Sequence, residues 1–173
     1  MNAPSLAVTG CTGRLGGRVA RRLAGRGAAQ RLIVRDPSRA PSLDGGAVVQ
    51  ASYADADAAR RTLEGVSTLF MVSAAETEDR VDQHRVFIDA AAAAGVDHIS
   101  YTSFFGAALD ATFTLARDHY ATEEHIKASG LRWTFPARES LPRLHPVVRR
   151  SGRRASWSRR RRSGCGCGAG RHR

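Results

Sequence analysis

A glycine-rich turn between an apolar stretch and an amphipathic one is the feature that most constrains how this chain can fold. The apolar residues 6–8 run into Thr9-Gly10-Cys11-Thr12-Gly13-Arg14-Leu15-Gly16, and the amphipathic stretch continues to Leu23. This order predicts a strand, a tight turn and a helix. Glycines let the backbone approach a pyrophosphate, and the free N–H groups at the start of the helix attract its charge. The turn therefore predicts a dinucleotide site, although ordinary strand-to-helix turns in glycine-rich chains share this order.

The expected contacts with a cofactor involve the whole turn. The third glycine, Gly16, falls one turn inside the helix, where a missing Cβ lets the helix pack closely on the strand. The residues that we expect to hold the cofactor here are Gly10, Thr12, Gly13, Arg14, Leu15 and Gly16.

A second apolar stretch, residues 31–36, lies where a dinucleotide fold places the residue that reads the adenosine ribose. If Arg35 lies just past this strand, its guanidinium can hold a 2′-phosphate, with Arg39 as a second cation, and the cofactor is NADP(H). If Asp36 points inward, it accepts from the ribose hydroxyls and the cofactor is NAD(H). Residues 37–38 turn the chain at once and leave Arg35 nearest the strand end, which favours NADP(H). Alternatively, the two charges form a solvated pair on the turn.

Strand and helix patterns alternate through the chain as far as residue 135. Short apolar runs predict strands, and longer runs with apolar residues three or four apart predict helices. The predicted strands cover residues 47–50, 68–72, 98–103 and 132–135, and the predicted helices cover 55–63, 78–94 and 115–129, with Gly95 and Gly130 ending the last two. We therefore predict an α/β fold, a Rossmann-type doubly wound parallel sheet with helices on both faces.

Polar or flexible residues follow the ends of the predicted strands. Parallel sheets bind ligands beyond the carboxyl ends of their strands, so these residues should gather at one edge. They are Gly10, Arg35, Ser52, Ser73 and Ser103. Of the serines, Ser73 and Ser103 are candidate cofactor ligands, together with the neighbouring Thr102.

The positive charge of the protein is confined to its last residues. Residues 1–135 hold fifteen Lys plus Arg and fifteen Asp plus Glu, whereas residues 136–173 hold twelve Arg and one acid, Glu139. The formal net charge of +11 therefore belongs to the second segment alone. That segment is rich in Arg, Gly, Ser and Pro and has no period that would bury a face, so we expect it to be disordered. The chain thus divides into a Rossmann domain, residues 1–135, and a basic tail, residues 136–173.

A change of reading frame is one possible origin for this tail. Residues 135–146 can be back-translated into codons that, with one base omitted after the Phe135 codon, read Phe-Leu-Arg-Glu-Ser-Leu-Tyr-Leu-Asp-Phe-Ile, which is an ordinary strand end followed by a helix. Consecutive Arg codons shifted by one base likewise become codons for Val, Ala, Asp or Gly. We therefore hypothesise that the tail is a frameshift product that replaces the C-terminal part of the fold. The alternative is a genuine basic tail that binds the phosphate backbone of a nucleic acid.

Several short motifs within residues 3–135 together resemble one protein family. They lie at residues 8–16, 34–37, 63–66, 83–85, 92–96, 101–103, 118–119 and 122–123. On these motifs the chain resembles the NmrA-like atypical short-chain dehydrogenases/reductases, and within them the NAD(P)H:quinone oxidoreductase type 2 branch. The resemblance implies a Rossmann-type domain that binds NADP(H) and a small C-terminal lobe that shapes the substrate pocket. It also implies a small-molecule substrate, either quinone-like or a small carbonyl compound.

The helix predicted over residues 115–129 carries the candidate catalytic residues, His119 and Tyr120. His119 matches a histidine of the family and could donate a proton or line the quinone pocket, although a histidine at such a place is more often a packing residue. Tyr120 stands where other short-chain reductases begin a Tyr-x-x-x-Lys pair, but Glu124 replaces the lysine. Phe104 and Phe105 either stack on a flat ring or pack in the core.

Two classes of function remain open from the sequence. The first is an NADPH-dependent oxidoreductase, and the second is a non-catalytic dinucleotide sensor that regulates a partner protein; a truncated chain with neither activity is a third possibility. No cysteines and histidines share a metal-ligand spacing, so we expect no metal site. We see no signal peptide and no membrane-length apolar run, and expect a cytoplasmic protein without membrane contact. The oligomeric state is not predicted.

Overall fold

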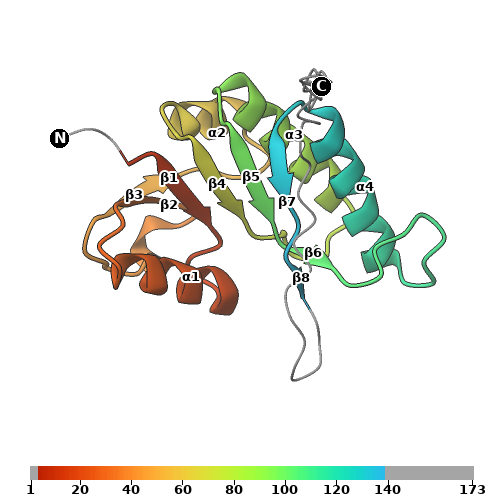
Figure 1. Ribbon diagram of the computed structural model, residues 1–173, viewed down its shortest axis with the longest axis horizontal. Coiled ribbons are helices and arrows are strands. Elements are labelled where there is room, and N and C mark those ends of the chain that lie inside the picture. The colour runs from red at the N-terminus through yellow and green to blue at the C-terminus, as the bar shows by residue number, and fades with distance from the viewer. Residues whose placement is uncertain (1–3, 139–173) are drawn as a thin grey trace, which may run out of the picture.

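Six parallel strands lie side by side in the order β3-β2-β1-β4-β5-β7 in the computed structural model, which describes residues 4–138 (Figure 1). The strands are β1 (Leu6–Thr9), β2 (Gln30–Val34), β3 (Gly46–Gln50), β4 (Thr68–Met71), β5 (His98–Tyr101) and β7 (Arg132–Thr134). Every neighbouring pair in this sheet is parallel. The strand order reverses between β1 and β4, which confirms the predicted Rossmann-type sheet and places its switch point beside the glycine turn.

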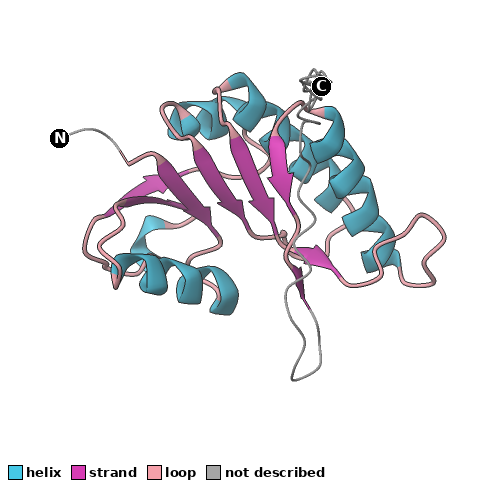
Figure 2. Cartoon of the chain, viewed as in Figure 1, coloured by secondary structure: helices cyan, strands magenta, loops and turns pink. Residues whose placement is uncertain are grey.

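Helices connect the strands and cover both faces of the sheet (Figure 2). They are α1 (Arg14–Ala24), α2 (Ala56–Leu63), α3 (Arg80–Ala93) and α4 (Thr114–Ala128), with a short 3₁₀ helix, η1 (Pro37–Arg39). The helix α1 packs on β1 and β2 from one side of the sheet. On the other side, α3 packs against both α2 and α4. No helix within residues 4–138 combines the length and the apolar character needed to cross a lipid bilayer.

Alternate residues of the strands build a separate apolar core on each face. On the face of α2 and α3, strand residues such as Leu69 and Ile99 pack with helix residues such as Phe87. On the opposite face, Val8 and Leu32 pack with residues of α1. Because side chains alternate along a strand, the register between neighbouring strands decides which residues share a core.

The structure differs from the predicted elements at the carboxyl end of β5. A single strand is predicted over residues 98–103, but it divides at Thr102 into β5 and β6 (Ser103–Phe104). The backbone leaves the sheet there after the Thr102 amide donates to Met71 O (3.0 Å), and β6 instead pairs with β8 (Ala137–Arg138). Backbone pairing thus continues three residues beyond the predicted boundary at residue 135. The rest of the predicted tail, residues 139–173, lies outside the described residues.

The helix α1 approaches β1 so closely that its first glycine, Gly16, admits no side chain. A Cβ at Gly16 would lie 2.7 Å from Thr9 O and 2.6 Å from the carbonyl carbon of Gly10, both backbone atoms that cannot move aside. Gly10 itself has φ of +63°, and a Cβ there would lie 2.9 Å from Cβ of Val72. The close packing expected of the third glycine in the motif is therefore confirmed.

We predict that Gly16→Ala lowers the free energy of unfolding by about 3 kcal/mol or more, because the backbone of β1 and α1 must separate to admit the methyl group. Urea unfolding followed by circular dichroism measures this change. The matched control is Gly25→Ala, since Gly25 has a helical φ of −64° and its Cβ would meet Arg21 O at an ordinary 3.4 Å. The control should be neutral or stabilising by up to about 1 kcal/mol. Equal effects of the two substitutions would refute the close-contact explanation.

Polar side chains fill the interface between α3 and α4. Arg80 and His84 from α3, and His119 and Thr122 from α4, are all buried. Arg80 Nη2 donates to His119 Nε2 (2.9 Å), and Arg80 Nη1 lies 3.6 Å from Asp118 Oδ2. Burial, helped by the charge of Arg80, lowers the pKa of His84 to about 3 and that of His119 to about 4. Both imidazoles are therefore neutral at physiological pH.

These histidines make the stability of the fold depend on pH. In the unfolded chain each histidine takes up a proton below about pH 6.5, whereas in the folded chain it stays neutral until the pH is much lower. Their contribution to stability is present above pH 6.5 and is lost as the pH falls. We expect the free energy of unfolding to drop by about 4 kcal/mol between pH 7 and pH 5, about 2 kcal/mol for each histidine.

Urea unfolding at the two pH values tests this expectation. His84→Gln removes one of the two groups and should reduce the difference between pH 7 and pH 5 by about 2 kcal/mol. The same loss in this variant as in the unchanged protein would show that His84 does not carry the effect.

Candidate functional site

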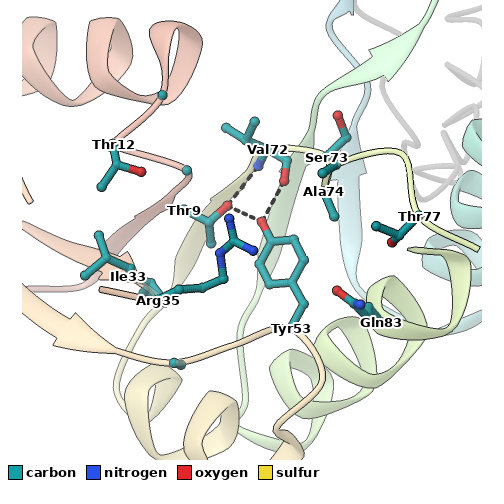
Figure 3. Close-up of a pocket in the computed structure, with 15 residues that line it drawn as sticks. Thr9, Thr12, Ile33, Arg35, Tyr53, Val72, Ser73, Ala74, Thr77 and Gln83 are labelled. Carbon is teal, nitrogen blue, oxygen red and sulfur yellow. Dashed lines mark hydrogen bonds between the residues drawn. The ribbon is translucent and has the colours of Figure 1, made fainter. Parts of the chain in front are cut away.

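A pocket of about 310 Å³ lies at the carboxyl ends of β1, β2, β3 and β4 (Figure 3). The glycine turn, the end of β2 and the segment after β4 supply most of its walls. Three of the predicted strand-end residues, Gly10, Arg35 and Ser73, meet here, as expected for a parallel sheet. The volume is at the lower end of the range for small-molecule pockets, about 300–1,000 Å³, and suits part of a dinucleotide.

The glycine turn presents backbone amides at the start of α1. The Gly13 amide donates to Gly10 O (2.9 Å), and the first amide with a partner along the helix is that of Gly17, which donates to Gly13 O (3.0 Å). No side chain in the described part of the chain caps this helix, and its first turn has no acidic residue. The amides of residues 14–16 are therefore available to an anion at the positive end of the helix dipole.

The side chains along this turn have different surroundings. Thr12 and Gly13 line the pocket. Arg14 and Leu15 have exposed side chains that do not line it, and Gly16 is buried against β1. Arg14 and Leu15 therefore face this pocket through their amides rather than through their side chains.

Arg35 extends from the end of β2 into the pocket, toward the ring of Tyr53 (Figure 3). Gln50 Nε2 donates to Arg35 O (3.0 Å) and so holds the backbone at this point. Asp36 instead turns to its own loop, where Oδ1 accepts from Ser38 N (3.0 Å) and Ser38 Oγ (2.7 Å) and caps η1. These hydrogen bonds lower the pKa of the Asp36 carboxyl. The pocket wall at the end of β2 is thus cationic.

Three consecutive amides in the segment after β4 are each bound by a side chain from a different part of the fold. We call residues 72–74 the clamped segment. The pairs, each 2.9 Å apart, are Val72 N with Thr9 Oγ1, Ser73 N with Thr102 Oγ1, and Ala74 N with His84 Nε2. Since these amides are occupied, the clamped segment cannot bind an anion through them. It offers a ligand the Ser73 hydroxyl and carbonyl oxygens, which suit the hydroxyl groups of a ribose.

Tyr53 joins the clamped segment to β1. Its hydroxyl donates to Val72 O (2.6 Å) and lies 2.5 Å from Thr9 Oγ1, which also accepts from the Val72 amide (Figure 3). Because the tyrosine hydroxyl donates to the carbonyl, it accepts from Thr9, and the three groups form a closed ring of hydrogen bonds. Burial raises the pKa of the Tyr53 hydroxyl. Tyr53 is therefore a fixed wall of the pocket with its ring beside Arg35.

The remaining predicted cofactor ligands lie behind this pocket. Thr102 and Ser103 are buried and do not line it. Thr102 acts on the pocket through the Ser73 amide, and the Ser103 hydroxyl donates to Glu123 on α4. Ser52 does not line the pocket either, and its hydroxyl accepts from Ala54 N.

The two predicted catalytic residues lie on α4, away from the lining of this pocket. Both ring nitrogens of His119 are engaged: Nε2 accepts from Arg80, and Nδ1 lies 2.9 Å from the Tyr101 hydroxyl. The ring also stacks on Phe104, with centroids 5.8 Å apart. Tyr120 is half-buried, and its hydroxyl has no hydrogen-bond partner within residues 4–138. The residue at the lysine position of the absent pair, Glu124, bonds to Lys127 (2.6 Å).

Several residues of the site were not identified from the sequence. Tyr53, Thr77 and Gln83 line the pocket, and Thr9 and His84 bind the clamped segment. Gln83 and His84 belong to one of the family-like motifs, which was the available signal for them.

Comparison with known proteins places this geometry in a family. A profile described as NAD(P)H-binding matches residues 10–137, about the whole of the described chain. Quinone oxidoreductase 2 of Escherichia coli (strain K12) is 40% identical over 134 residues, which are 75% of this chain and 46% of that protein. The structure of the NADPH-dependent quinone oxidoreductase of E. coli with NADPH superposes with a TM-score of 0.70 at 37% identity, covering 76% of this chain and 48% of that one.

Two further relatives extend the comparison. The Citrobacter sp. triphenylmethane reductase complexed with NADP(H) gives a TM-score of 0.71 at 33% identity, covering 77% of this chain and 49% of that one. An NmrA-like family domain-containing oxidoreductase of Aspergillus flavus is 35% identical over 88 residues, 47% of this chain and 29% of that protein. The chain thus spans about half the length of the quinone oxidoreductase and of the triphenylmethane reductase. With its glycine turn, its parallel sheet and these matches, the chain belongs to the NAD(P)H-binding family and is similar in part to an NmrA-like oxidoreductase.

Proposed function

We propose that the pocket beside the glycine turn binds NADPH and that the chain is the cofactor-binding half of an NADPH-dependent oxidoreductase. The observation that carries the proposal is the pairing of free amides at the start of α1 with a cationic wall at Arg35. The amides suit the pyrophosphate, and the guanidinium suits the 2′-phosphate that distinguishes NADPH from NADH.

The pocket divides its polar groups by charge in a way that fits a dinucleotide. Donors gather at the turn and at Arg35, whereas the clamped segment offers acceptors and the Ser73 hydroxyl. Phosphates require donors and ribose hydroxyls require acceptors, so each part of the ligand meets groups of the opposite kind. Asp36 is engaged by Ser38, and this favours NADPH because no carboxylate repels the 2′-phosphate from within the pocket.

The substrate that fits this proposal is a flat, quinone-like molecule or another small carbonyl compound. When bound, NADPH supplies the hydride for such a reduction, and the protein must orient it and exclude water. The relatives named above include a quinone oxidoreductase and a triphenylmethane reductase, and these names support a substrate that carries a conjugated ring. The exposed rings of Phe104 and Phe105, just beyond β5, offer apolar faces on which such a ring can stack.

His119 has a positioning role in this proposal. Its two nitrogens are occupied, and burial keeps it neutral by lowering its pKa to about 4. It therefore orients the Phe104 ring and the Tyr101 hydroxyl rather than donating a proton. The hydroxyl of Tyr120 has no hydrogen-bond partner within residues 4–138. Tyr120 is therefore the better candidate of the two for contact with a substrate.

We predict that Arg35→Ala weakens NADPH binding at least tenfold and changes NADH binding less than threefold, because only NADPH carries the 2′-phosphate. Calorimetric titration of each cofactor measures both constants. The matched control is Arg60→Ala, which removes an exposed arginine of α2 that does not line the pocket and should change the NADPH constant less than threefold. Equal weakening of NADPH and NADH by Arg35→Ala would mean that this residue does not read the phosphate.

We also predict steady oxidation of NADPH in the presence of a simple quinone. The loss of absorbance of the reduced nicotinamide measures this reaction. Turnover with NADPH at several times the rate with NADH would support the proposed activity. Tight binding of NADPH without turnover across a panel of quinones and small carbonyl compounds would instead favour the alternative, a dinucleotide sensor that regulates a partner protein.

A further inference from the structure

The hydrogen bonds around His84 fix which of its nitrogens carries the proton. The Ala74 amide can only donate, so His84 Nε2, 2.9 Å away, must accept. In a neutral imidazole the other nitrogen then carries the hydrogen, and Nδ1 donates to Thr122 Oγ1 at 2.9 Å. The Thr122 hydroxyl in turn donates to Asp118 O (2.8 Å). Every donor in this chain of bonds meets an acceptor, and only one tautomer of His84 satisfies it.

His84 is buried and does not line the pocket. Its hydrogen-bond partner Ala74 does line the pocket. Ala74 is the last residue of the clamped segment, and its amide depends on His84 alone among the described residues. The neighbouring amides of Val72 and Ser73 have their own partners on β1 and after β5. Losing the His84 bond would free one end of the segment while leaving the other end attached.

We propose that His84 is a positioning residue for the cofactor, which holds Ala74 in place from behind the pocket, and that Thr122 on α4 sets its tautomer. This inference rests on the proposed binding of NADPH and deepens it. The interface between α3 and α4 is thereby connected to the cofactor pocket through the sequence Asp118, Thr122, His84 and Ala74. Neither Thr122 nor Asp118 lines the pocket, so their influence on binding is indirect.

The two amide substitutions of His84 separate its two hydrogen bonds. A glutamine places an acceptor near the position of Nε2 and can keep the bond to the Ala74 amide. An asparagine is shorter, reaches only the position of Nδ1, and can keep the bond to Thr122 while leaving Ala74 without an acceptor. Both variants lose the aromatic contacts of the imidazole with Tyr53 and Tyr101, so both should lose stability to a similar degree.

We expect His84→Asn to raise the dissociation constant of NADPH at least tenfold and His84→Gln to change it less than threefold. Thr122→Val, which keeps the shape of the side chain but removes the hydroxyl, should raise the constant about fivefold, whereas Thr122→Ser should leave it within twofold. His125→Asn is the control for the loss of a histidine, because His125 pairs with Asp89 away from the pocket. Titration calorimetry gives the constants, and urea unfolding shows how far each variant is destabilised.

Hydrogen exchange of the Ala74 amide, followed by NMR without any cofactor, is the second readout. It should be slow in the unchanged protein and in His84→Gln, and at least tenfold faster in His84→Asn. If NADPH does not bind the unchanged protein, the proposed function fails, but this exchange pattern still tests the contact. Equal NADPH constants or equal Ala74 exchange in the asparagine and glutamine variants would overturn the positioning role, since a merely structural histidine would affect both alike.

Discussion

The close approach of α1 to β1 is the constraint on which the rest of the site depends. The backbone of Gly16 lies against the carbonyl groups of Thr9 and Gly10, where no side chain fits. This contact brings the start of α1, with its free amides, to the edge of the sheet at which the strands end. It also sets Gly10 against Val72, so that the turn and the segment after β4 face one pocket. A looser contact would separate the donors of the turn from the acceptors across the pocket.

The opposite wall is rigid for a different physical reason. Its backbone amides are bound by side chains from β1, from the residue after β5 and from α3, so three elements hold one short segment. A buried amide without a partner costs free energy, and the three acceptors remove that cost while fixing the carbonyls in place. The pocket is therefore preformed on both sides, which reduces the ordering that binding a flexible dinucleotide would require.

Local features of the sequence were enough to predict the fold and one wall of the site. The glycine turn, the alternation of strands and helices, and Arg35 at a strand end each depend on residues that are close in the chain. The engagement of Asp36 by Ser38 is also local, and an Asp two residues before a Ser is a known signal for such a turn. In the sequence it is the turn at residues 37–38 that favours Arg35 as the residue nearest the strand end.

The other wall could not be predicted because its contacts join distant residues. Thr9 and Val72 are 63 residues apart, and Thr102 and Ser73 are 29 apart. The sequence places Thr102 directly after a strand, and this position does not reveal whether its hydroxyl faces the pocket or binds a neighbouring amide. The position of His119 on a helix likewise does not reveal whether its ring nitrogens are free to donate a proton. Its partners Arg80 and Tyr101 lie 39 and 18 residues away and could not be assigned without the packing of α3 on α4.

The most direct test of the account is to map where NADPH contacts the protein, using backbone amide NMR spectra of the 15N-labelled chain during a titration. The account predicts that the largest saturable shifts fall on the glycine turn, on Arg35 and on residues 72–75. Shifts that saturate on another surface, with the turn unchanged, would contradict it.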